Sequence, residues 1–71
     1  MADEPRTFPA PWRADKIAAG YCIRDAGGQA LAYVYARPTM AEAMQARTLT
    51  TDEARRFAYI IAQLPELLKG R

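Results

Sequence analysis

The 71-residue chain contains a single cysteine, Cys22, and no histidine. One cysteine cannot form an internal disulfide bond, and the lack of histidine removes the commonest metal ligand. A chain of this size buries only about 60% of the surface that its unfolded form exposes, so its own core is small. Such small domains usually need a disulfide, a metal or a partner subunit for stability. We therefore expect a second copy of the chain, or another protein partner, to cover part of its surface.

The charge of the chain is nearly balanced, with 10 Lys and Arg against 8 Asp and Glu and a formal net charge of +2. This excess indicates nucleic-acid binding only if the arginines gather on one surface. Met1–Pro5 is acidic and ends in proline, unlike a signal peptide. No apolar run approaches the roughly 20 residues of a membrane helix. With the single cysteine, these features predict a cytoplasmic protein without a membrane segment.

The clearest structural pattern is a β-hairpin. Residues 21–25 and 29–37 are rich in Tyr, Ile, Val and Ala, and Ala26-Gly27-Gly28 separates them. A three-residue loop ending in glycine is typical of a type I turn followed by a G1 bulge. Pro38 ends the second strand. Residues 12–18 match a strand less well, and we expect them to form the first strand of the sheet.

The turn also predicts a register for the hairpin. Asp25 would lie opposite Gln29, which places Tyr21 opposite Tyr33, with Tyr35 on the same face. The opposite face would carry Cys22, Arg24, Ala30, Ala32, Val34 and Ala36. Both faces are therefore largely apolar, and a shift of one residue would exchange them.

Two helix starts are visible in the C-terminal half. Thr39–Glu42 matches a capping box and predicts a short helix over residues 40–47, with a surface loop as the alternative. Thr50–Glu53 is a second capping box, which predicts the start of the main helix. Its apolar side chains recur at the spacing of one helical face, on Ala54, Phe57, Ala58, Ile61 and Leu64. One more helical turn would follow Pro65 and stop at Gly70.

These elements predict an α+β fold in which a three-stranded antiparallel β-meander is packed by the C-terminal helix. We expect a flexible tail over residues 1–10 and a single domain over residues 11–71, with Trp12 as its first anchor. We expect Phe57, Ile61 and Leu64 to pack on the sheet. Since one helix covers one face, the second apolar face would meet the short helix, the Trp12 segment or another molecule.

Several short motifs spread along the chain occur together in one group of proteins. They are Pro11-Trp12, Arg24–Gln29, Ala32–Tyr35, Leu49–Arg56 and Leu64–Leu68. In this combination the chain resembles a family of short uncharacterised bacterial proteins of proteobacterial type. The resemblance covers residues 11–69 and implies no activity, cofactor or catalytic residue.

The sequence contains no pattern for catalysis or for a cofactor or metal site. Cys22 has no histidine to act as its base, so we expect a buried structural cysteine. Asp52 and Glu53 are adjacent on a helix and point apart, and helix capping explains both. Gly27-Gly28 lacks the Gly-Lys-Ser/Thr context of a phosphate loop. We therefore expect a protein that is not an enzyme.

The leading functional hypothesis is an interaction module that self-associates or binds a protein partner. In a meander the third strand lies at an edge and can accept another strand. The candidate interaction surface consists of Tyr21, Tyr33, Tyr35, Arg24 and Arg37.

The alternative is a small nucleic-acid-binding accessory protein. Tyrosines on a sheet face can stack on bases, and arginines can contact phosphates. The candidate contacts are Arg13, Arg24, Arg37, Arg55 and Arg56. This hypothesis requires the five arginines to share one surface.

Overall fold

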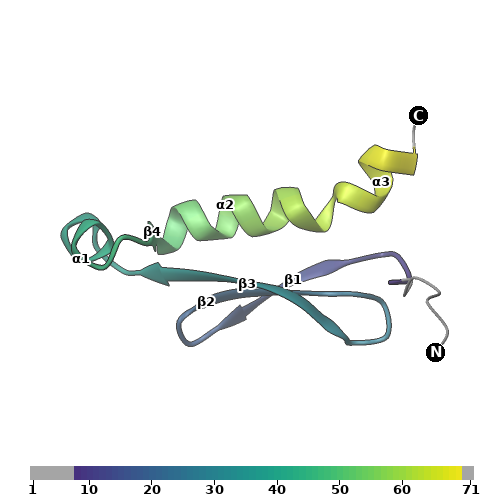
Figure 1. Ribbon diagram of the computed structural model, residues 1–71, viewed down its shortest axis with the longest axis horizontal. Helices are drawn as coiled ribbons and strands as arrows, with labels where there is room; N and C mark the ends of the chain where they lie inside the picture. Colours follow the sequence, from purple (N-terminus) through teal and green to yellow (C-terminus); the bar gives the residue numbers. More distant parts are fainter. Residues whose placement is uncertain (1–7, 70–71) are drawn as a thin grey trace, which may run out of the picture.

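The computed structural model describes residues 8–69 of the chain, and Figure 1 shows one long helix along one face of a small sheet. The elements are β1 (Arg13–Ile17), β2 (Gly20–Arg24), β3 (Ala30–Arg37), α1 (Met40–Ala46), β4 (Leu49–Thr50), α2 (Thr51–Ala62) and α3 (Leu64–Lys69). The predicted α+β class is confirmed. Within the described range no helix is long and apolar enough to cross a membrane.

The sheet has the strand order β1-β2-β3-β4. β1, β2 and β3 form the predicted antiparallel meander, and β4 adds a parallel edge strand to β3. The three-stranded prediction is therefore correct for the meander and incomplete for the sheet, which in residues 8–69 has four strands and mixed directions. β4 is only two residues long, so it has no alternating pattern that the sequence could reveal.

The predicted register of the hairpin is wrong beyond its turn. The Asp25 N–H donates to the Gln29 carbonyl over 3.0 Å, as the turn requires. The pairing then shifts at a bulge, and Leu31 is the extra residue on β3. Tyr21 consequently pairs with Val34 instead of Tyr33. Because side chains alternate along a strand, this single insertion exchanges the two faces of β3.

The core lies between α2 and the sheet face that carries Tyr21, Ile23 and Val34. Its buried members are Tyr21, Ile23, Val34, Ala36, Ala54 and Ala58. Ala54 and Ala58 are both fully buried, and their small side chains allow α2 to lie close to the strands. The prediction that Phe57 and Leu64 pack on the sheet is wrong, since they are 55% and 36% exposed. Ile61 packs against the core only in part.

The two predicted helix starts are confirmed. Thr39 caps α1 by accepting from the Glu42 N–H over 3.2 Å, and the helix covers most of the predicted 40–47 segment. At the start of α2, the Thr50 hydroxyl accepts from the Glu53 N–H over 3.2 Å. The Glu53 carboxylate accepts in return from the Thr50 N–H over 3.0 Å, which completes the capping box.

The N-terminal segment follows the edge of the hairpin turn. The Ala26 N–H donates to the Pro9 carbonyl over 2.9 Å, and the Trp12 indole N–H donates to the Phe8 carbonyl over 3.1 Å. Phe8, Pro9 and Ala10 thus lie against the domain, although the sequence predicts a tail up to residue 10. The rest of that predicted tail, residues 1–7, and the predicted stop at Gly70 lie outside the described residues.

Candidate interaction surface

β3 has an open edge over most of its length. β4 pairs only with Ala36 and Arg37, and among residues 8–69 no strand pairs with Ala30–Tyr35 on that side. The Ala36 N–H donates to the Ala19 carbonyl over 2.9 Å, toward β2. Successive residues of a strand direct their backbone groups to opposite sides. Tyr33 therefore directs both of its backbone groups to the open edge, and Tyr35 directs its N–H there, while the Tyr35 carbonyl faces β4.

A groove runs beside this edge, between β3 and α2. It is shallow and open, with a volume of about 430 Å³, and is lined in part by Tyr33, Tyr35, Phe57 and Ile61. A second hollow of about 360 Å³ shares Ala32 and Ile61 with the groove, so the two are neighbours.

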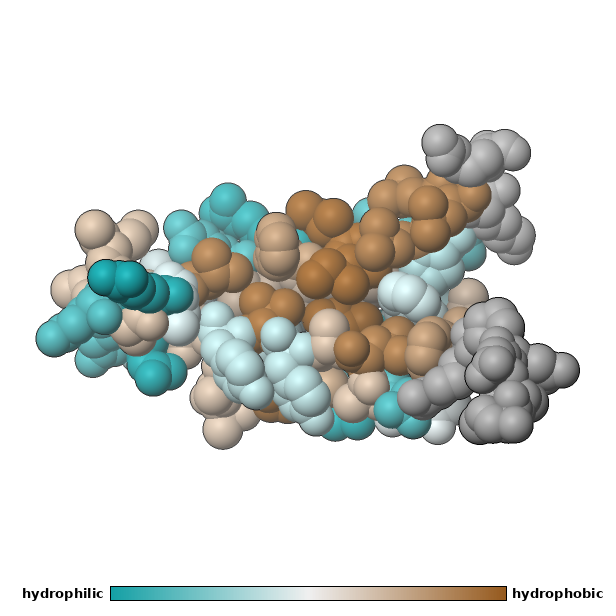
Figure 2. Space-filling model, viewed as in Figure 1, coloured by the Kyte–Doolittle hydropathy of each residue, from teal (hydrophilic) through white to brown (hydrophobic). Residues whose placement is uncertain are grey.

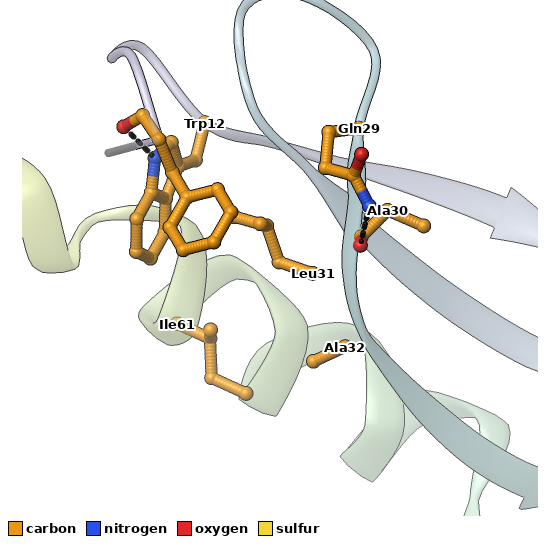
Figure 3. Close-up of a pocket in the computed structure, with 7 residues that line it drawn as sticks. Trp12, Gln29, Ala30, Leu31, Ala32 and Ile61 are labelled. Carbon is orange, nitrogen blue, oxygen red and sulfur yellow. Dashed lines mark hydrogen bonds between the residues drawn. The ribbon is translucent and has the colours of Figure 1, made fainter. Parts of the chain in front are cut away.

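The second hollow lies at the hairpin-turn end of the groove. In Figure 3 the Trp12 and Leu31 side chains lie on one side of it and Ile61, from α2, lies on the other. Phe8 and Gln29 complete much of its lining. Most of these side chains are apolar, so the groove and the neighbouring hollow offer an apolar surface to a ligand.

The helix flank above the groove is also apolar. Phe57, Ile60, Ile61 and Leu64 are spaced as neighbours on one side of a helix, and Phe57 and Ile60 are 55% and 56% exposed. Figure 2 shows apolar side chains in a band along α2 and α3 and onto the strands below. We call Phe57, Ile60 and Leu64 the overhanging stripe. The spacing of this stripe is visible in the sequence, but sequence reasoning assigned Phe57 and Leu64 to the core.

Tyr33 and Tyr35 lie on the sheet face that points away from α2. Both are about half exposed, at 52% and 55%, and their rings stack with centroids 6.1 Å apart and planes at 10°. Tyr21, which was predicted to share this surface, is buried in the core at 6% exposure. The Leu31 bulge places it on the face opposite the other two tyrosines. Cys22, also on the outer face, is fully buried as predicted.

The five predicted arginines divide into separate groups, and two of these groups pair with an aspartate. Arg13 and Arg24 contact Asp15 on the outer face, with Nε–O distances of 3.0 and 3.3 Å. Arg37 lies beside Glu42 at the α1 end of the sheet, where its guanidinium donates to the Ala36 carbonyl. These three side chains therefore occupy the strand layer.

Arg55 and Arg56 project from α2 and both bind Asp52. The hydrogen bond from Arg55, followed by the charge of Arg56, lowers the pKa of the Asp52 carboxyl. The same hydrogen bond raises the pKa of Arg55. Since these two arginines belong to the helix layer, the five predicted nucleic-acid contacts do not form one surface.

Comparisons of the chain with protein-family models, curated proteins and solved structures found no match. The predicted resemblance to short bacterial proteins therefore stays a prediction. In the part of the chain that the structure describes, no three His, Cys, Asp or Glu side chains gather as metal ligands.

Proposed function

We propose that this chain is a non-enzymatic protein-interaction module of the cytoplasm that binds an extended strand of a protein partner along the open edge of β3. One observation carries the proposal. α2 packs on the sheet through Ala54, Ala58 and in part Ile61, while Phe57 and Ile60 stand exposed beside an unpaired strand edge. An unpaired strand edge and an exposed apolar patch are both features that proteins use for binding.

The mode of binding follows from the groove. A strand laid along β3 would exchange backbone hydrogen bonds with Tyr33 and with the free N–H of Tyr35. Alternate side chains of that strand would enter the groove beneath Phe57 and Ile61. The other side chains would lie beside the rings of the two tyrosines on the outer face. The preferred ligand is thus a short segment with apolar or β-branched residues at every second position.

The chain can be displayed on yeast and screened with a random peptide library. Displayed copies are held apart, so the screen tests strand binding without competition from a second copy of the chain. We expect the enriched peptides to alternate apolar residues and to lose at least about 10-fold in affinity with Tyr33→Pro, which removes an outward N–H. Tyr33→Thr keeps this N–H and is the matched control. Peptides without alternation, or with equal affinity for both variants, would contradict strand addition at β3.

The stacked pair of Tyr33 and Tyr35 favours one alternative, a nucleic-acid-binding accessory protein. Arg24 lies on the same outer face as the two rings, which suits base stacking beside a phosphate contact. Four of the five arginines already pair with Asp15 or Asp52, which weakens this alternative.

A titration of mixed single-stranded RNA and DNA separates the two functions. If the chain is a protein-interaction module, no binding is expected even at about 20 mM salt, since a charge of +2 provides few phosphate contacts. Binding that weakens steeply with salt and disappears in Tyr35→Ala would favour the alternative. Fluorescence anisotropy of labelled oligonucleotides is a suitable measurement.

A further inference from the structure

We propose that the partner strand is β3 of a second copy of this chain, paired antiparallel across a two-fold axis near Tyr33. This inference rests on the proposed function and names its partner. The two sheets would join into one, with both α2 helices on the same face and the overhanging stripes of Phe57, Ile60 and Leu64 directed toward each other.

The open edge is complementary to itself. Leu31–Tyr35 contains no charged residue, so two copies meet without repulsion between like charges. Tyr33 lies at the centre of this segment and directs both of its backbone groups outward. Tyr33 of one copy can therefore exchange two hydrogen bonds with Tyr33 of the other. Tyr35 then faces Leu31 of the second copy and can donate its N–H to it, and β4 begins to pair at the next residue, Ala36.

The same two-fold axis explains why α2 carries large side chains on this flank. α2 contacts β1, β2 and β3, and β2 is the middle strand of these three. With strands about 4.8 Å apart, the two helices would lie about 14 Å apart across the joined sheet. Helices in direct contact are about 8–10 Å apart, so the extra space must be filled. Phe57 and Ile60 project toward that space and are more than half exposed in a single copy.

The exposed area of five large side chains would supply about half of an ordinary dimer interface. The five residues at this site are 36–56% exposed, namely Tyr33, Tyr35, Phe57, Ile60 and Leu64. Since a large side chain offers on the order of 150–250 Å², these residues together would bury roughly 450 Å² on each copy. A standard interface buries about 800 Å² on each partner. The groove walls and the strand backbone would have to supply the other half.

Sedimentation equilibrium of the full chain at about 10 μM tests the proposal. The wild-type chain is expected at twice its mass of 7.9 kDa. Phe57→Lys should weaken the dimer by at least about 100-fold, because it places an ammonium group in the apolar contact. Its folded monomer should survive, since Phe57 is 55% exposed and Glu53 lies four residues earlier. Circular dichroism checks the fold.

Tyr59→Lys is the matched control, on the same helix and 49% exposed but outside the overhanging stripe. It should leave the dimer intact. A monomeric wild-type chain, or equal effects of the two substitutions, would overturn the proposal.

The arrangement of the strands has its own test. In a mixture of isotope-labelled and unlabelled chains, we expect intermolecular NOEs between Leu31 of one copy and Tyr35 of the other. A dimer whose NOEs lie elsewhere overturns the antiparallel β3 pairing. If the chain is monomeric but displayed copies still select alternating peptides at Tyr33, only the second copy is refuted as partner. If neither occurs, the proposed function fails as well.

Discussion

Alanine in place of Gly20 is expected to cost about 4 kcal/mol or more of folding free energy, which would leave the domain largely unfolded. A Cβ atom at this position would lie 1.9 Å from the Val34 carbonyl oxygen and 3.0 Å from the Tyr35 Cα. Both are backbone atoms of β3, so the contact is relieved only if β2 and β3 separate. The φ angle of +148° adds strain that an L-residue rarely tolerates.

The other two glycines within the described residues provide graded controls for this substitution. Gly28 has a φ of +93° but open space around a built Cβ, so Gly28→Ala should cost only about 1–2 kcal/mol of backbone strain. Gly27 has its nearest atom, Asp25 Oδ1, at 3.6 Å, and Gly27→Ala should change stability by less than about 0.5 kcal/mol. Urea unfolding followed by circular dichroism gives the three values. A loss for Gly20→Ala no larger than that for Gly28→Ala would refute the steric argument.

The second large effect is expected at Asp25, the one buried charged side chain in the described part of the chain, at 3% exposure. Its Oδ1 atom accepts from the N–H groups of Gly27 and Gln29, both over 2.9 Å. Its carbonyl accepts from the Gly28 N–H over 3.0 Å and from the Arg13 guanidinium over 3.4 Å. Asp25 thus holds the turn between β2 and β3 in place through its side chain and its backbone.

Asp25→Ala should destabilise the domain by about 2–3 kcal/mol, because two amide groups of the turn lose their acceptor. Asp25→Asn keeps an oxygen at the Oδ1 position and should cost less than about 1 kcal/mol. Urea unfolding of the two variants measures the difference. If alanine and asparagine cost the same, the hydrogen bonds to Oδ1 do not contribute as proposed.

Much of the fold was predictable because its signals act over short distances in the chain. The hydroxyls of Thr39 and Thr50 accept hydrogen bonds from amides three residues later. Four consecutive residues are therefore enough to predict each helix start. The turn between β2 and β3 is equally local, and its Asp25–Gln29 contact was predicted correctly. The open edge of β3 also followed from the sequence, since the third strand of a meander has a free side.

The candidate site itself was predictable only in part. Tyr33 and Tyr35 were correctly placed at an edge strand, whereas Tyr21 and the overhanging Phe57 were assigned to the wrong environments. Both errors concern which side of an element meets the core. In α2 the alanines and the large apolar residues occupy adjacent stripes along the helix. The spacing of the residues alone does not show which stripe faces the sheet.

The sequence by itself determined where the strands of the meander and the two capped helices lie, since turns and caps are decided by neighbouring residues. Only the tertiary structure decided the register of β2 against β3, where the extra residue Leu31 exchanges the faces of β3. It also decided that α2 approaches the sheet through Ala54 and Ala58. These choices depend on packing between segments far apart in the chain, where close contact through small side chains outweighs the hydrophobicity of Phe57.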